Sequence, residues 1–134
     1  MRIALAVALG SGLGGMARVA IAGWMLSAFG GNFPFGVLAV NILGSFAIGL
    51  GAAMTSPNGR LFIGPAGRQF FLAGFCGGFT TFSFFSLETM HFLQESRFLA
   101  AVLYSALTLI VSMIAVWLGN LLGRRSSLCE PNAG

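Results

Sequence analysis

The chain has 134 residues, of which 57% are hydrophobic and only 7% are charged. Because a soluble globular domain carries roughly 25% charged residues, this composition excludes a water-soluble fold and indicates a protein that lies in a lipid bilayer. The net charge of +4 does not indicate nucleic-acid binding, since no basic patch is interleaved with aromatic residues.

Four apolar runs follow one another along the chain, at about residues 3–29, 35–54, 70–91 and 98–122. Each is long enough to form a helix across a bilayer core, which takes about 20 residues. Turn-forming residues separate the runs, and each connector is too short to hold a soluble domain. The sequence therefore predicts an all-α membrane protein, a single domain of residues 1–134 with four transmembrane helices.

The arginines predict how these helices are oriented. Four spans place both termini on one side of the membrane, and Arg97 belongs to the other side. The arginines expected on the side of the termini are Arg2, Arg60, Arg68, Arg124 and Arg125. By the positive-inside rule, we expect the termini in the cytoplasm.

Glycines recur at the spacing that lets membrane helices approach closely. Three GxxxG pairs are present: Gly10 with Gly14, Gly74 with Gly78, and Gly119 with Gly123. Small residues at this spacing allow backbone contact in lipid. We expect all three pairs to pack helices, either within the chain or between subunits.

Two polar side chains interrupt the first two runs. Arg18 lies well inside the first, where a charge is expensive and indicates function by default. It either reaches an interface or a neighbouring helix's carbonyls, or lends positive potential to an anion's route. Asn41 lies in the middle of the second run, with Ser45 one turn further on the same face. Its amide either makes an interhelical hydrogen bond or donates to an anion that has lost its water.

The third run combines paired glycines with hydroxyl residues, from Gly77 to Ser86, and these are poor residues for a helix interior. We expect a break there, which would free backbone carbonyls at membrane depth as a seat for a monovalent cation. Phe82 and Phe85 are three residues apart and share a helix face. Their positive ring edges are suited to holding an anion, although apolar packing is the common role of such a pair.

The fourth run carries hydroxyls on one face, at Tyr104, Thr108 and Ser112. Such hydroxyls either bond back to their own helix or form a ladder of donors for an ion that is losing its hydration shell. Glu88 and His91 close the third run, where both can reach the interface. The sequence shows no nucleophile motif, phosphate loop or metal cluster, so we expect no enzyme.

Three segments together resemble one known family. Residues 74–83 read GFCGGFTTFS and are similar to the signature GFxGGxTTFS of the CrcB/Fluc fluoride channels, bacterial proteins that let cytoplasmic fluoride leak out. Residues 14–18 (GGMAR) and 40–46 (VNILGSF) resemble the same family, and the likeness covers all four spans.

The resemblance implies an antiparallel dimer of like or unlike chains in the bacterial cytoplasmic (inner) membrane, with two pores and a central structural sodium ion. It implies passive export of fluoride, which would protect the cell from fluoride toxicity. The carbonyls of Gly77 and Thr80 would hold the sodium. Arg18 matches an arginine near the pore's vestibule, and Glu88 matches a family carboxylate to which we assign no role.

The resemblance also implies an ion pathway. The residues it assigns to that pathway are Asn41, Phe82, Ser83, Phe85, Tyr104, Thr108 and Ser112.

Two positions depart from the family pattern. Val37 replaces the threonine of a common GTL segment, and Phe84 replaces a hydroxyl residue in TFSTFS. Both changes are expected to alter conduction rate or helix packing. The charge bias of the chain favours a single orientation, and therefore an oppositely oriented, unlike partner.

Two other functions fit a chain of this size. A proton-coupled exporter of cationic drugs also uses four short helices, but it would want a carboxylate in the middle of its first helix, and this chain has none there. An accessory subunit that only packs against others would conduct nothing alone and would leave the hydroxyl row without a role.

Overall fold

The computed structural model describes residues 1–31, 33–57, 59 and 61–128, and its regular elements are all helical. The elements are α1 (Arg2–Phe29), α2 (Phe35–Met54), α3 (Pro65–Gln69), the π-helix η1 (Phe70–Cys76), α4 (Gly77–Phe79), α5 (Phe82–Gln94) and α6 (Phe98–Leu128). Four helices are long and apolar enough to cross a membrane, with α3 to α5 together forming the third. The predicted all-helical membrane architecture and the break in the third helix are both confirmed.

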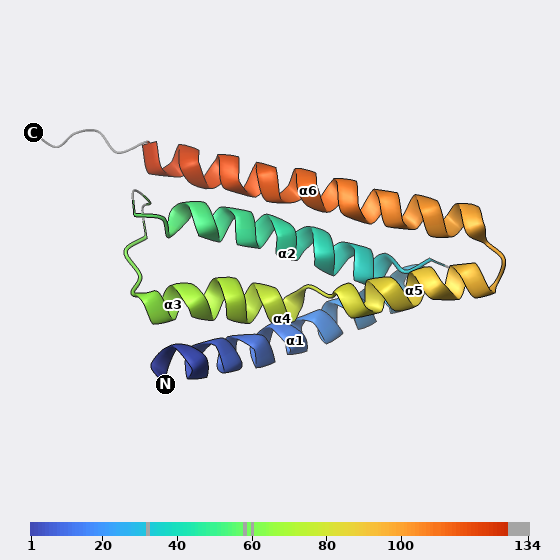
Figure 1. Cartoon of the computed structure of the whole chain (residues 1–134), viewed down its shortest axis with the longest axis horizontal. Helices are drawn as coiled ribbons and strands as arrows, with labels where there is room; N and C mark the ends of the chain where they lie inside the picture. Colours follow the sequence, from blue (N-terminus) through green and yellow to red (C-terminus); the bar gives the residue numbers. More distant parts are fainter. Residues whose placement is uncertain (32, 58, 60, 129–134) are drawn as a thin grey trace, which may run out of the picture.

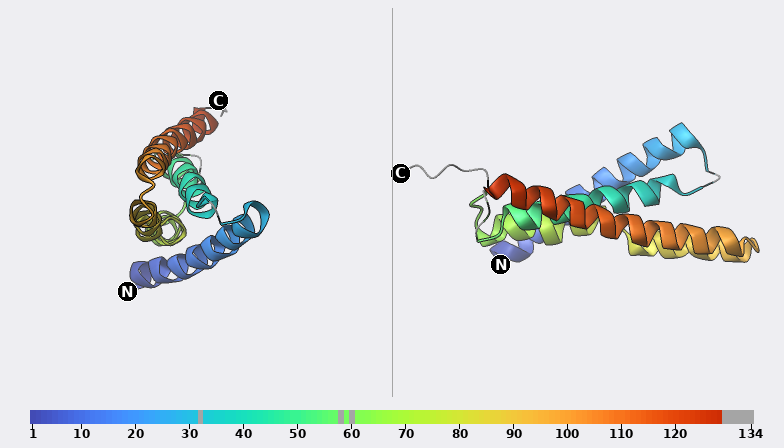
Figure 2. Two further views of the ribbon diagram at one scale, coloured as in Figure 1. Left: turned by 90° about the vertical axis from the view of Figure 1, so that its right-hand side faces the viewer. Right: turned by 90° about the horizontal axis from the view of Figure 1, so that it is seen from above.

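The long helices run side by side (Figure 1), with the start of α1, the start of α3 and the end of α6 at one end. Four of the arginines predicted to share a side lie at this end, and Arg60 is outside the described residues. Arg97 lies at the opposite end, in the turn between α5 and α6, where it pairs with Glu95 at 3.2 Å. At that end the α1–α2 pair diverges from the α5–α6 pair (Figure 2).

The helix ends follow from local sequence. The third helix begins at Pro65, earlier than the apolar run at Phe70, because proline suits the first turn of a helix. It ends at Gln94, where Ser96 adopts a positive φ of 58° and turns the chain into α6. The π-helix η1 was not predicted, since its apolar sequence carries no signal that separates it from an α-helix.

Glycines make the closest helix contacts. A Cβ on Gly14 would collide with the carbonyl oxygen of Phe75, and one on Gly78 with that of Ser11, so α1 packs directly on η1 and α4. A Cβ on Gly119 would likewise strike the carbonyl oxygen of Phe46, where α6 packs on α2. The GxxxG pairs therefore pack helices within one chain. This was the first of the two predicted arrangements, the other being packing between subunits.

We expect Gly14→Ala to lower the free energy of unfolding by about 1–3 kcal/mol, because the added methyl must push α1 away from η1. Gly12→Ala is the matched control on the same helix, since a Cβ there meets nothing within 4 Å. Unfolding by SDS in mixed micelles, followed by circular dichroism, measures both variants. Equal stability of the two variants would contradict this packing.

A candidate ion pathway at the break in the third helix

The third helix is interrupted at two threonines. Thr80 has φ −76° and ψ 159°, and Thr81 has φ −148° and ψ 120°, so both are extended and separate α4 from α5. In a continuous helix, each N–H would donate to the carbonyl four residues earlier. Here the N–H of Thr81 donates to Oδ1 of Asn41 at 2.8 Å instead of to Gly77. The N–H of Phe84 donates to Oγ1 of Thr81 at 3.3 Å instead of to Thr80. The carbonyls of Gly77 and Thr80 thus lose their helical donors.

Asn41 holds the unwound segment from α2. Besides accepting from the Thr81 N–H, its Nδ2 donates to the Thr81 carbonyl at 3.1 Å, so one amide satisfies both backbone groups of that residue. The interhelical hydrogen bond expected as one role of Asn41 is therefore present. Its second N–H makes no hydrogen bond with the described residues, which leaves one donor for another group.

A cavity of about 300 Å³ lies beside this break. Most residues of the predicted pathway and sodium site line it: Asn41, Gly77, Thr80, Phe82, Phe85, Thr108 and Ser112. They come from α2, α4, α5 and α6 and from the break itself, so the fold gathers groups that are far apart in the sequence.

The two phenylalanines of the pathway differ in burial. Phe82 is 76% exposed, and its ring centroid lies 5.6 Å from that of Phe85. Phe85 is partly buried against Tyr104, with centroids 5.6 Å apart. Phe85 therefore packs within the chain, whereas the ring of Phe82 remains open to a ligand, to lipid or to another subunit.

The predicted hydroxyl row lies on α6 and is buried, with Tyr104 0% and Thr108 4% exposed. The hydroxyl oxygens of Tyr104, Thr108 and Ser112 find no hydrogen-bond partner among the described residues. Leaving a buried donor unpaired costs about 1–3 kcal/mol, so three in a row indicate a missing partner. The fold therefore keeps a line of unused donors on one face of α6.

Two predicted pathway residues lie away from the cavity wall. Tyr104 lies nearer the start of α6 than the residues that line the cavity, and the rings of Phe33, Phe85 and Phe92 surround it. Ser83 is exposed and lines neither this cavity nor the next one described below. Helical periodicity correctly places Tyr104 on the same face of α6 as Thr108 and Ser112. It does not reveal how far along the helix the cavity extends.

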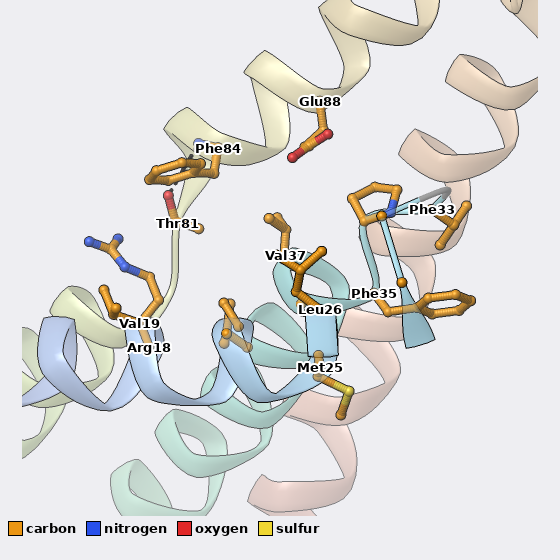
Figure 3. Close-up of a pocket in the computed structure, with 17 residues that line it drawn as sticks. Arg18, Val19, Met25, Leu26, Phe33, Phe35, Val37, Thr81, Phe84 and Glu88 are labelled. Carbon is orange, nitrogen blue, oxygen red and sulfur yellow. Dashed lines mark hydrogen bonds between the residues drawn. The ribbon is translucent and has the colours of Figure 1, made fainter. Parts of the chain in front are cut away.

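A second cavity, of about 410 Å³, lies between α1, α2 and α5 (Figure 3). Arg18, Phe84 and Glu88 line it among apolar side chains, and Thr81 lines both cavities. The guanidinium carbon of Arg18 lies 5.9 Å from the centroid of the Phe84 ring. Of the alternatives predicted for Arg18, a hydrogen bond to carbonyls of a neighbouring helix is not found among the described residues.

Thr81 is the functional residue that the sequence analysis did not assign. It caps α5 through its hydroxyl, pairs with Asn41 through its backbone and lines both cavities. A threonine directly before a run of helical residues is a helix-start signal, so this position was visible in the sequence. Its contact with Asn41 was not, because it depends on how α2 packs on the third helix.

Residues 5–120 match the family described as CrcB-like protein, Camphor Resistance (CrcB). The chain is 42% identical over 121 residues to a fluoride-specific ion channel FluC of Opitutus terrae, covering 90% of this chain and 92% of that protein. It is 46% identical over 116 residues to a fluoride-specific ion channel FluC of Rhodospirillum rubrum, covering 87% and 90%. The chain therefore belongs to the CrcB-like family, which is a family of ion channels and not of enzymes.

Proposed function

We propose that the chain is a fluoride-selective channel through which cytoplasmic fluoride leaves a bacterial cell, down its electrochemical gradient, and that this protects the cell from fluoride. The observation that carries the proposal is the row of three buried hydroxyls, at Tyr104, Thr108 and Ser112, that find no hydrogen-bond partner in the described part of the chain. Its relatives named as fluoride-specific channels support the choice of ion.

The chemistry of the pathway suits a small anion that holds its water tightly. Such an ion can shed water only where the pore supplies other donors. The hydroxyls of α6 and the free N–H of Asn41 are donors of this kind, and the exposed ring of Phe82 offers a positive edge. The described wall of the 300 Å³ cavity contains no carboxylate that would repel an anion.

We assign the released carbonyls of Gly77 and Thr80 to a structural sodium ion. Unwound backbone at membrane depth can coordinate sodium in this way. Gly77 is exposed, and a Cβ there would meet nothing within 4 Å, so its surroundings leave space for an ion or for a second subunit. When bound, the ion would supply a fixed positive charge and link the two ends of the broken helix.

Removal of sodium is expected to lower the thermal unfolding temperature of the purified protein. A ligand that binds only the folded state stabilises it by about 2.7 kcal/mol when present at 100 times its dissociation constant. The measurement compares protein prepared in sodium with protein prepared in N-methylglucamine, and then adds sodium back. An unfolding temperature that is independent of sodium would contradict the assignment.

We further propose that the channel is a dimer of oppositely oriented subunits in the inner membrane. One chain alone is too small to enclose a pore, and Phe82 stays 76% exposed at the edge of the cavity. The arginines at the end of the termini favour a cytoplasmic location for that end. A single orientation of this chain would require an unlike partner of the opposite orientation.

Anion efflux from liposomes tests the function. Purified protein is reconstituted into vesicles loaded with fluoride or chloride, and the external ion is followed with selective electrodes. We expect rapid loss of fluoride without loss of chloride. If folded protein carries no fluoride alone, co-expression with an oppositely oriented relative should restore efflux. Failure of both preparations would overturn the proposed function.

A further inference from the structure

Arg18 is a charged residue in the interior of a membrane-spanning helix, and the described residues offer it no polar partner. The ion pair found among the described residues joins Arg97 to Glu95, and no hydrogen bond there involves Arg18. The guanidinium instead lies over the ring of Phe84, whose centroid is 5.9 Å from the guanidinium carbon. A guanidinium over an aromatic face within about 6 Å is attracted by the negative ring face, so Phe84 takes the place of a counter-ion.

The backbone from which the Phe84 ring projects is held in place by the break in the third helix. The backbone N–H of Phe84 donates to Oγ1 of Thr81 at 3.3 Å, and Asn41 holds both backbone groups of Thr81. The backbone of Phe84 therefore has a defined position in the first turn of α5, while its side chain stays half-exposed over the 410 Å³ cavity. Figure 3 shows the ring and Thr81 close to Arg18.

Glu88 would be the natural partner of Arg18, since both line this cavity. Figure 3 shows the two side chains apart, on different helices, and they form no ion pair within 4 Å. An Arg18 side chain released from Phe84 would be free to turn toward Glu88. The electrostatic potentials of the two opposite charges would then largely cancel at the position of an ion in the cavity.

The cavity that holds Arg18 adjoins the candidate pathway, because Thr81 lines both. A charge that lies between low-dielectric walls, and that no opposite charge beside it cancels, raises the local concentration of ions of the opposite sign. A guanidinium kept apart from Glu88 therefore attracts anions to the cavity that adjoins the candidate pathway.

We infer that Phe84 is a positioning residue, whose ring holds the Arg18 guanidinium away from Glu88 so that Arg18 draws fluoride toward the pathway. This inference rests on the proposed function. It gives a role to a ring that replaces the hydroxyl common at this position in the family pattern. The direct contact with the ion belongs to other residues, and Phe84 acts through Arg18.

Chemical modification of Arg18 tests the contact without any transport. Phenylglyoxal reacts with free guanidinium groups, and mass spectrometry resolves each arginine. We expect Arg18 to react about two- to fivefold faster in Phe84→Leu and Phe84→Met, which is the factor that corresponds to a surface cation–π contact. In Phe84→Trp, Arg18 should react no faster than in the natural protein.

Phe98→Leu is the control, because Phe98 is a 63% exposed ring that does not contact Arg18. An unchanged rate in both ring-free variants would overturn the inference.

Efflux at two salt concentrations tests the consequence. At about 0.01 M of an impermeant salt, where the Debye length is about 30 Å, Phe84→Leu should slow fluoride efflux about two- to fivefold. At about 1 M, where the Debye length is about 3 Å, the variant and the natural protein should agree. If the natural protein carries fluoride and Phe84→Leu matches it at low salt, the inference alone fails. If the natural protein carries no fluoride with or without a partner, the proposed function fails, and the role of Phe84 in drawing fluoride fails with it.

Discussion

Asn41→Ala is expected to reduce fluoride efflux at least tenfold and to lower the free energy of unfolding by at least ~2 kcal/mol. The substitution removes both hydrogen bonds to Thr81, at 2.8 and 3.1 Å, and leaves a buried N–H and a buried carbonyl without partners. Each such group costs about 1–3 kcal/mol. The loss of the free N–H in the cavity wall adds a direct effect on the ion. Efflux from liposomes and SDS unfolding measure the two effects separately.

Two further variants sharpen this prediction. Asn41→Asp keeps an acceptor for the Thr81 N–H but loses the donor to the Thr81 carbonyl, and it adds a negative charge to the cavity wall. It should therefore conduct even less fluoride than an alanine variant of equal stability. Asn120→Ala removes a partly buried amide of α6 that makes no side-chain hydrogen bond with the described residues, so its efflux should stay within about twofold of the natural protein. Full efflux through Asn41→Ala would contradict the proposed role.

The hydroxyl row should show the opposite effect on stability. Tyr104→Phe, Thr108→Val and Ser112→Ala each remove a buried hydroxyl that has no partner among the described residues. The free energy of unfolding should stay constant or rise by up to about 1 kcal/mol, since an unsatisfied polar group is lost. Fluoride efflux should fall about two- to tenfold for Thr108→Val and for Ser112→Ala, because both residues line the cavity and each hydroxyl is worth about 0.5–1.5 kcal/mol to the ion.

Thr55→Val is the matched control for a hydroxyl that is already satisfied. Thr55 donates to the Gly51 carbonyl at 2.7 Å and accepts from Arg68 at 3.3 Å, at the other end of α2 from the turn to α1. Its removal should cost about 0.5–1.5 kcal/mol of stability and leave efflux unchanged. If the three α6 variants lose stability and keep their efflux, their hydroxyls are structural and the pathway lies elsewhere.

Much of the architecture could be predicted from the sequence, because lipid imposes simple rules. Spanning helices need long apolar runs, and the four runs appear as four long helices. The break could be predicted because paired glycines and threonines disfavour a helix interior, although it lies at Thr80 and Thr81, just after the glycines.

The contacts of the candidate site could not be predicted in the same way. Asn41 and Thr81 are 40 residues apart, and their pairing depends on how α2 packs against the third helix. Helical periodicity placed three hydroxyls on one face of α6, but only packing shows that Tyr104 lies behind the cavity wall. Arg18 and Phe84 each drew attention as separate residues, and the sequence gives no sign that they meet.

The most direct test of a fluoride pathway is the reversal potential of currents through the purified protein in a planar bilayer. The fluoride concentration would be tenfold higher on one side of the bilayer. Chloride on the other side would make the total anion concentrations equal, and the cation concentration would be the same on both sides. The proposed pathway predicts a reversal potential that shifts toward the fluoride equilibrium value by about 59 mV for each tenfold change in the fluoride ratio. A potential that follows chloride or the cation, or one that ignores the fluoride gradient, would contradict the pathway.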